Sequence, residues 1–523
     1  MSTIRMRRDL ALILGVAACS VLVPVIFLPN WDVAWHFEMA QRLLEGERLY
    51  ENIVDVNLPW AIYGYLPFVY LSNLFGGSPL IWLGCLVAIL ALLALVVAEQ
   101  SEFGARTGQG WRWTWARVGI AVVLVVLPAV NFGKLEHFAV LLTLPYLLAR
   151  LNGDAAPDDT EFGILVVLSV IAGIGFSLKP HFGLPWLVTQ VVVTRRQWSP
   201  RNILLIGLTA LPMAIQLLAI PIQFPDLVRL YQLFGRQYAA FWHLPPYHVL
   251  VDHLYLPAAA MVMIGSAGQV QPTRRLLVRG LAWIGLAWII TGVVQGKGWS
   301  YHFLPASMTL VLCGLFTILY FDGSIRGSAV RGLITVSVVL IGMAGLRSGV
   351  VSLDYPARRS QLPASLRDAS DGMRALVLSV RMVTAYPLLN ELNARNVGSF
   401  PTVWPLQVEY GQAGLPGRFV PVRSPGDMTE PESILFQSVV DDLVQSKPEL
   451  VLVSDGTDPL FNDAYFDYVA YFSQNEAFKN EMSGYVVGPK LGHVRFYIRS
   501  DSSRQARSGA DRGPRSLKSD VTR

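Results

Sequence analysis

Four short stretches of this sequence place charged or histidine side chains directly beside long apolar runs. They read NWDVAWH at 30–36, NFGKLEHF at 131–138, SLKPHFGL at 177–184 and QGKGWSYHFLPA at 295–306, and a fifth stretch, YENIVDVNLPW at 50–60, adds another acid. A charged side chain beside a bilayer costs free energy, so a residue of this kind usually has a function. The candidate site residues in these stretches are Asp32, His36, Asp55, Glu136, His137, Lys179, His181, Lys297 and His302.

These residue types suit one kind of chemistry. A carboxylate can take the proton of a hydroxyl group, and fixed cations can hold an anionic group such as a phosphate. Together they favour the reaction of a negatively charged, lipid-borne substrate with a hydroxyl. Each residue alone has a structural explanation, because a lysine near a helix end usually extends to the membrane surface and a histidine beside an aromatic ring is more often structural.

The composition identifies a membrane protein. Of the 523 residues, 53% are hydrophobic and only 15% are charged, whereas soluble domains have about 25% charged residues. The three cysteines, Cys19, Cys85 and Cys313, lie inside apolar runs, where a disulfide framework is not expected. The net charge of +5 comes from arginines in short loops, which set membrane orientation, so we expect membrane lipids and no nucleic acid as partners.

Long apolar runs predict about eleven transmembrane helices, because about 20 such residues cross a bilayer. The first run follows a basic flank and contains the lipoprotein-like segment VAACS at 16–20, but it continues to Leu28. We therefore expect an uncleaved first helix, with cleavage as the alternative. The predicted helices cover 10–28, 79–98, 118–132, 137–150, 162–178, 182–194, 202–222, 254–270, 277–296, 302–320 and 328–346.

The arginines predict the orientation of these helices. With a cytoplasmic N-terminus, alternate loops are rich in arginine and the opposite loops are poor in it, as the positive-inside rule requires. Residues 60–75 would break this alternation as a full span, so we interpret them as a helix at the outer interface, interrupted by Pro59 and Pro67. All the charged stretches then fall on the outer side. The cytoplasmic arginines are Arg106, Arg112, Arg117, Arg150, Arg195, Arg196, Arg201, Arg274, Arg275, Arg279, Arg326 and Arg331.

The composition changes after Arg347. Strand-like segments at 374–380 and 449–455 enclose helical segments at 385–394 and 432–445, a pattern that indicates a small α/β domain. An odd number of spans places this domain on the outer side of the membrane, the same side as the charged stretches. We divide the chain into an all-α polytopic membrane domain at 1–350, the α/β domain at 351–500 and a disordered tail at 501–523.

The first outer loop has the form D-x-x-W-H…A-x-x-L-x-x-G…L-Y-x-x-I-x-x-x-N-x-P. This pattern resembles the first loop of the GT-C superfamily of glycosyltransferases, which includes the protein O-mannosyltransferases and the aminoarabinose transferases of lipid A. The resemblance continues through GKLEHFAVLLTLPYLL and LKPHF and covers about the first 320 residues. The matching positions of the first loop are Asp32, Trp35, His36, Ala40, Leu43, Gly46, Leu49, Tyr50, Ile53, Asn57 and Pro59.

The resemblance implies a hexosyl- or pentosyltransferase of the inner (plasma) membrane. A sugar would leave a polyprenyl phosphate and be attached, with inversion, to a hydroxyl of an extracytoplasmic glycan, lipid or protein. Asp32 matches the acid of the family's first loop and becomes the expected general base, while His36 and Asp55 would bind substrate. Lys179, His181, Lys297 and His302 would hold the phosphate, and Glu136 with His137 would orient the acceptor or fix a histidine tautomer.

Two departures from the family concern the same site. Val33 follows Asp32 where many relatives have adjacent acids, and Lys134 stands where relatives often carry glutamine. The sequence indicates no metal and we expect no cofactor. Because Asp32 lies between Trp31 and Trp35 at the membrane edge, we expect partial desolvation to raise its pKa.

Two other functions share this topology. A polymerase or ligase of lipid-linked glycans usually has one very large outer loop, and the loop at 223–253 is moderate in length. A transporter usually shows two halves with corresponding broken helices, and the sequence contains no such halves. A glycosyltransferase is therefore the favoured interpretation.

Overall fold

The computed structural model describes residues 3–27, 29–100, 111–152, 159–194, 198–322, 326–351 and 372–500. The predicted tail at 501–523 lies outside these residues. The chain folds into two compact units, which we describe separately. The first unit comprises 1–46, 57–228 and 242–354, and the second comprises 47–56, 229–241 and 355–523.

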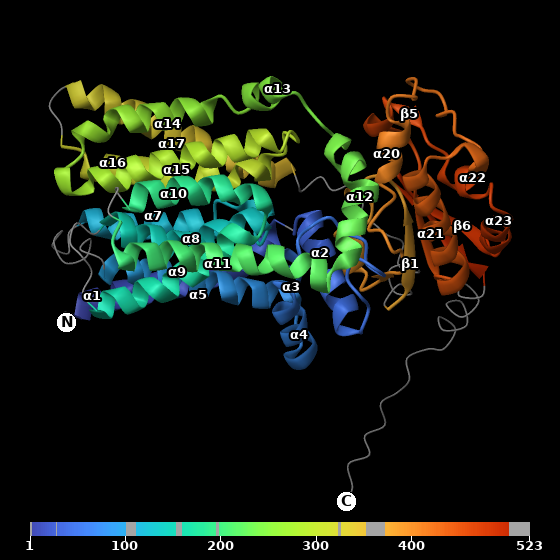
Figure 1. Ribbon diagram of the computed structural model, residues 1–523, viewed down its shortest axis with the longest axis horizontal. Coiled ribbons are helices and arrows are strands. Elements are labelled where there is room, and N and C mark those ends of the chain that lie inside the picture. The colour runs from blue at the N-terminus through green and yellow to red at the C-terminus, as the bar shows by residue number, and fades with distance from the viewer. Residues whose placement is uncertain are drawn as a thin grey trace, which may run out of the picture. The chain divides into compact units, whose positions relative to one another are not determined.

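The first unit is helical (Figure 1). Each of the eleven apolar runs identified in the sequence contains a helix, and residues 60–75 form two short helices with a break after Tyr63. The longer helices are α1 (Thr3–Ile26), α2 (Trp31–Leu44), α5 (Pro79–Gln100), α7 (Trp111–Val125), α8 (Leu135–Asn152), α9 (Asp159–Ser177), α10 (Gly183–Thr194), α11 (Pro200–Gln223), α14 (Tyr255–Ser266), α15 (Arg275–Val294), α16 (Leu304–Tyr320) and α17 (Arg326–Val351). The shorter ones are α3 (Pro59–Tyr63), α4 (Leu66–Phe75), α13 (Pro246–Val251) and the 3-10 turns η1 (Ala129–Asn131), η2 (Pro180–Phe182), η3 (Ala267–Gln269), η4 (Pro272–Arg274) and η5 (Ser300–Phe303).

Six helical stretches among the described residues are long and apolar enough to cross a membrane. The expected number of eleven spans is therefore not established, because several of the predicted helices are shorter than a bilayer requires. The six stretches are Arg7–Ile26, Pro79–Glu99, Pro200–Gln223, Pro272–Val294, Ser300–Tyr320 and Ala329–Arg347.

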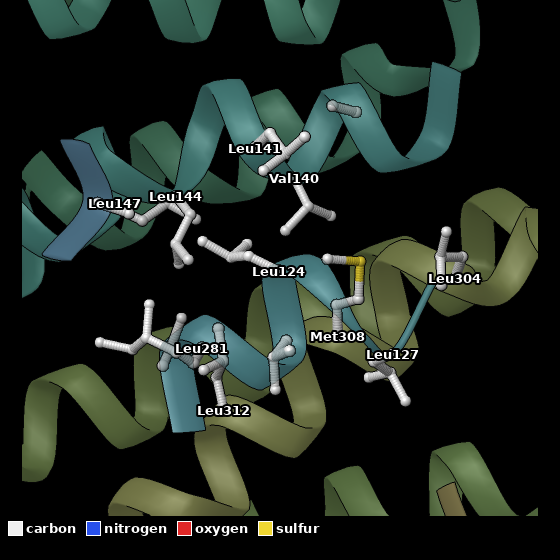
Figure 2. Packing of buried hydrophobic residues seen from close by; sticks show 14 of the residues in the cluster. Leu124, Leu127, Val140, Leu141, Leu144, Leu147, Leu281, Leu304, Met308 and Leu312 are labelled. Carbon is white, nitrogen blue, oxygen red and sulfur yellow. The ribbon is translucent and has the colours of Figure 1, made fainter. Parts of the chain in front are cut away.

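The core of the first unit forms where α7, α8, α15 and α16 meet. Figure 2 shows apolar side chains from these four helices pointing toward one another. On α8 the buried leucines recur at helical spacing, at Leu141, Leu144 and Leu147, so that they line one side of the helix. By contrast, Leu218 and Ile222 on α11 are exposed apolar residues, as expected for a surface covered by lipid.

Glycines let some of these helices approach closely. A Cβ atom at Gly84 of α5 would lie 2.5 Å from the main-chain oxygen of Ser20 in α1, and one at Gly173 of α9 would lie 2.8 Å from that of Thr209 in α11. Small residues at helix contacts are typical of membrane bundles, where packing replaces the hydrophobic effect as the driving force. These contacts fix the helices that carry the polar stretches.

The second unit contains a five-stranded sheet in the order β2-β1-β3-β7-β6. Strands β2, β1 and β3 are parallel, and β7 and β6 continue the sheet antiparallel. The strands are β1 (Arg374–Leu378), β2 (Arg395–Asn396), β3 (Leu450–Ser454), β6 (Tyr485–Leu491) and β7 (Val494–Arg499), with a separate pair β4 (Thr457–Asp458) and β5 (Ala464–Tyr465). The helices are α19 (Leu388–Glu391), α20 (Pro405–Tyr410), α21 (Glu430–Ser446), α22 (Tyr468–Phe472) and α23 (Glu476–Met482), with short 3-10 turns η8 (Met382–Thr384), η9 (Pro425–Asp427) and η10 (Pro459–Phe461). Strands β1 and β3 occupy the two predicted strand segments.

Two segments from earlier in the chain are built into this unit. The amide of Val54 donates to the main-chain oxygen of Ser399 at 2.8 Å, and Glu47 forms an ion pair with Arg395. Helix α12 (Pro225–Ala240) carries Phe234, whose ring packs edge-on against Phe400 at 5.5 Å. The second unit is therefore completed by residues that the sequence alone places in the loops of the membrane domain.

Candidate active site

The N-terminus of α2 positions Asp32. Asn30 caps this helix, and its side-chain oxygen accepts a hydrogen bond from the amide of Asp32 at 3.0 Å. His36 lies one turn later, where its Nδ1 atom contacts the main-chain oxygen of Asp32 and its ring stacks on Tyr65 at 4.6 Å. The cap and the stacked ring therefore hold the carboxylate and the imidazole close together.

Lys134 is the direct partner of Asp32. Its Nζ atom forms an ion pair with Oδ2 of Asp32 and lies 3.4 Å from the side-chain oxygen of Asn30. The same ammonium sits 3.0 Å above the ring centroid of Tyr301, a cation–π contact that favours burial of the charge. From the sequence, Lys134 stood out only as a departure from the family, although its place in the stretch NFGKLEHF was a signal for a role in the site.

Lys134 controls the pKa of Asp32. Burial by itself raises the pKa of this carboxyl, but the positive charges around it, that of Lys134 first, together outweigh burial and lower the pKa below its usual value. The expected increase is therefore wrong, because the sequence did not show a cation beside the acid. Burial also favours the neutral form of the partner, and for an ammonium this means that it lowers the pKa of Lys134.

A second ion pair lies beside the first. Glu136, in the first turn of α8, is fully buried, and its Oε1 atom accepts a hydrogen bond from Nζ of Lys179 at 2.6 Å. Its Oε2 atom is buried and has no hydrogen-bond partner among the described residues. Lys179 precedes η2, and its Nζ atom lies 5.9 Å from the ring centroid of Tyr301. One aromatic ring is thus close to both ammonium groups.

The histidines divide into two kinds. His137 has both ring nitrogens engaged by the main chain, since Nδ1 accepts from the amide of Gly133 at 3.0 Å and Nε2 contacts the oxygen of Leu124 at 2.7 Å. This arrangement fixes the neutral tautomer and supports the turn that carries Lys134. In contrast, Nε2 of His181 and Nδ1 of His302 are buried without a partner in the described part of the chain. Burial, with the nearby charge of Lys179, lowers the pKa of His181 to about 3.

Lys297 and Asp55 lie in different parts of the molecule. Lys297 is buried in the turn after α15, between two glycines with φ of +66°, and burial lowers its pKa to about 8. The charges of Lys179, Lys134 and Lys297 all act on His302, so Lys297 belongs to the same cluster. Asp55 is a buried residue of the second unit, where its charge acts on Tyr231.

A small cavity of about 20 Å³ opens beside Asp32, Lys134, Glu136 and Lys179. It has room for about one water molecule. Two lysines and two carboxylates line the cavity, and Lys297, whose charge acts on His302 as theirs do, adds a third cation to the surroundings that can attract an anion. A larger ligand requires the lysines to move away from their carboxylate partners. The polar residues that line the cavity are Asp32, His36, Asn57, Tyr65, Lys134, Glu136 and Lys179.

The cluster offers no group of metal ligands in the part of the chain that the structure describes, since no three His, Cys, Asp or Glu side chains are placed to share an ion there. Its chemistry is that of ammonium groups next to carboxylates, with histidines that are neutral or engaged by the main chain.

Comparison with known proteins identifies the fold. The sequence matches no family model and no curated protein. The structure is similar to the crystal structure of ArnT from Cupriavidus metallidurans bound to undecaprenyl phosphate, with a TM-score of 0.50 and 12% identity over 93% of this chain and 97% of ArnT. It also aligns with the cryo-EM structure of the arabinofuranosyltransferase AftD from Mycobacteria, with a TM-score of 0.43 and 14% identity over 93% of this chain but only 40% of AftD. The similarity to ArnT shows that this chain shares the fold of that protein.

Proposed function

We propose that this protein is a membrane glycosyltransferase that moves a hexose or pentose from a polyprenyl-phosphate donor to a hydroxyl of an extracytoplasmic glycan, lipid or protein. One observation carries the proposal: the carboxylate of Asp32 and the ammonium groups of Lys134 and Lys179 surround one cavity. This cavity lies in a fold shared with ArnT, whose structure holds undecaprenyl phosphate.

In the proposed reaction the acceptor oxygen attacks the anomeric carbon while the bond from that carbon to the phosphate oxygen breaks. The acceptor proton passes to Asp32, and the electron pair of the broken bond stays on the phosphate. Attack from the face opposite the leaving group inverts the anomeric configuration. A phosphate needs no proton to leave, so the main task of the site is to stabilise its charge.

The lysines suit this task. Lys179 is held by Glu136 and Lys134 by Asp32, so both ammonium groups are fixed at the cavity before a ligand arrives. Lys297 adds a third cation, and the buried nitrogens of His181 and His302 can bond to phosphate oxygens. Buried cations that are already largely dehydrated can stabilise a developing negative charge at little further cost of desolvation. We therefore propose no metal or other cofactor.

The Asp32–Lys134 pair couples donor binding to catalysis. While Lys134 stays beside Asp32, the lowered pKa makes the carboxylate a weak base. A donor phosphate competes for the same ammonium, and once Lys134 turns toward it, burial dominates and the pKa of Asp32 rises. Asp32 then becomes an effective base only when the donor is bound, so the acceptor is not activated in an empty site.

Other residues have supporting roles. Oε2 of Glu136 is available to accept a hydrogen bond from the acceptor hydroxyl, and His36 holds its place beside Asp32 through the contact with the main chain. His137 positions the turn that carries Lys134. For Asp55, in the second unit, we propose a role in substrate positioning.

We further propose that the protein lies in the inner (plasma) membrane with the cluster and the second unit outside the cytoplasm. The arginine distribution supports this orientation. Alkaline phosphatase fused after Ser500 should be active and the same enzyme fused after Gln197 inactive. The reverse pattern would place the cluster in the cytoplasm and contradict an extracytoplasmic acceptor.

The donor is tested with purified protein in nanodiscs and a panel of radiolabelled polyprenyl-phosphate sugars. We expect saturable binding of one donor and its consumption when envelope glycans or lipids are added. Lys179→Ala should reduce donor binding, whereas Lys479→Ala, at an exposed ion pair of the second unit, should not. If no polyprenyl-phosphate sugar binds, or if both variants bind equally well, the proposal fails.

A further inference from the structure

A long groove lies between α1 and α7, on the part of α1 that is remote from Asp32. It has a volume of about 630 Å³, within the range of pockets that hold small molecules. Its walls are almost entirely apolar, and small side chains at Ala11, Gly15 and Ala121 leave the space between the two helices open. A Cβ atom at Gly15 would meet nothing within 4 Å.

Arginines close one end of this groove. Arg8 is exposed there, and Arg117 is nine-tenths buried. Nη1 of Arg117 lies 2.7 Å from Asp9 and 3.7 Å from Glu99, but its Nε atom is buried without a hydrogen-bond partner among the described residues. Asp9 and Glu99 both lie beside Arg117, so the exposed guanidinium of Arg8 and the Nε atom of Arg117 are the cationic groups that this end of the groove offers to a ligand.

The length of the groove matches one leaflet of a bilayer. From Arg8 to Cys19, the limits of the lining residues on α1, the helix rises by about 16 Å at 1.5 Å per residue. Half of a bilayer's hydrocarbon core measures about 15 Å. An apolar channel of this depth with cations at one end is complementary to a lipid whose acyl chain ends near the bilayer centre and whose headgroup is anionic.

We propose that this groove binds an anionic phospholipid, with one acyl chain between α1 and α7 and the phosphate at Arg8 and Arg117. The arginines supply the selectivity, because each cation near a membrane surface attracts anionic lipid headgroups. A polyprenyl-phosphate donor is not the occupant, since its phosphate must reach Asp32, which follows the opposite end of α1. The exclusion of the donor rests on the proposed function, whereas the binding of an anionic lipid in this groove does not.

The experiment uses the purified full-length protein and native mass spectrometry with added phosphatidylglycerol or phosphatidylcholine of the same acyl chains. We expect phosphatidylglycerol to bind at least about fivefold more tightly, the effect of one arginine at a headgroup. Gly15→Leu should abolish this preference by filling the groove. The matched control is Gly163→Leu on α9, another exposed helical glycine whose Cβ would meet nothing within 4 Å.

Arg8→Gln provides a second variant that does not disturb packing, because Arg8 is exposed. It should weaken phosphatidylglycerol binding about fivefold and leave phosphatidylcholine binding unchanged. Equal binding of the two lipids, or equal effects of Gly15→Leu and Gly163→Leu, would overturn the proposal. It would also be overturned if undecaprenyl phosphate displaced phosphatidylglycerol from the wild-type protein but not from Gly15→Leu, because the groove would then belong to the donor.

Discussion

Glu136 in the first unit and Glu432 in the second are both fully buried in the first turn of a helix, yet their surroundings differ. Both carboxylate oxygens of Glu432 are hydrogen-bonded. Oε1 accepts hydrogen bonds from the hydroxyls of Tyr410 and Tyr471, the latter at 2.8 Å. Oε2 accepts a hydrogen bond from Arg423 at 2.6 Å. Glu136 has one oxygen on Lys179, and its other oxygen is buried without a partner among the described residues.

The difference separates a structural carboxylate from one that is ready for a ligand. Buried polar atoms are almost always hydrogen-bonded, so an exception requires an explanation. Around Glu432 every bond is satisfied within the fold, and the network joins α20, α21 and α22. Around Glu136 the nearby nitrogens of His181 and His302 are also buried without described partners. We interpret several such atoms in one cluster as the proposed site, whose remaining partners would come from a substrate.

Removal of the proposed base should have the largest effect. Asp32→Asn keeps the size of the side chain but removes the proton acceptor, so transfer should fall by about 10²–10⁴-fold, the usual contribution of a positioned base. Asp55→Asn, in the second unit, is the control and should have a smaller effect. Single-turnover rates with a polyprenyl-phosphate sugar measure both. A larger loss in Asp55→Asn would mean that the base has been assigned to the wrong carboxylate.

Much of this arrangement could be predicted from the sequence. Long apolar runs located the helices, and short apolar, strand-like segments located β1 and β3, because hydrophobicity is a local property. The convergence of Glu136, Lys179 and His302 was also predicted, since all lie at helix ends on the same expected side. These features depend on nearby residues or on simple counting of spans.

The pairing inside the cluster could not be predicted. That Lys134 would meet Asp32, 102 positions away, depends on the packing of α2 against the turn before α8, which no local pattern encodes. The sign of the Asp32 pKa shift was wrong for this reason. Likewise His137 looked like a substrate ligand until its two main-chain partners were known, and Glu47 and Phe234 gave no indication that they belong to the second unit.

Lys134→Gln should produce the second-largest effect. If Lys134 binds the donor phosphate, donor affinity should fall by about 10–100-fold, the range for a hydrogen bond to a charged group. The loss of the ammonium also raises the pKa of Asp32, so the acidic limb of the pH–rate profile should move to higher pH. Isothermal titration and rates between pH 4 and 8 test the two effects. An acidic limb that stays in place would show that Lys134 does not control Asp32.

The contrast between the two glutamates can be tested directly with matched substitutions. Glu136→Gln should reduce transfer per folded molecule by about tenfold, because Lys179 loses its anchor and the acceptor loses a hydrogen-bond partner. Glu432→Gln should instead lower the free energy of unfolding by about 1.5–3 kcal/mol, as expected for hydrogen bonds to a charged group, and leave transfer per folded molecule unchanged. Thermal unfolding and single-turnover rates separate the outcomes. Equal losses of transfer per folded molecule in Glu136→Gln and Glu432→Gln would show that the two glutamates do not differ in role.

The smallest effect concerns Lys297 and pH. Burial lowers the pKa of this lysine to about 8, so it is largely protonated at pH 7 and largely neutral at pH 9. If it binds the donor phosphate, donor affinity should fall by about tenfold between these values, because above its pKa the lysine must take up a proton before it can pair. The donor is a phosphate diester and does not titrate in this range.

Lys297→Arg and Lys297→Ala identify the group responsible for this dependence. Arginine stays protonated throughout, so Lys297→Arg should bind the donor equally well at pH 7 and pH 9. Lys297→Ala should also be independent of pH but bind weakly at both values, since it never carries the charge. Burial lowers the pKa of Lys134 as well, and that lysine is unchanged in both variants. If donor affinity of Lys297→Arg still falls tenfold between pH 7 and pH 9, the titrating group is Lys134 and not Lys297. That result would exclude Lys297 as the phosphate ligand.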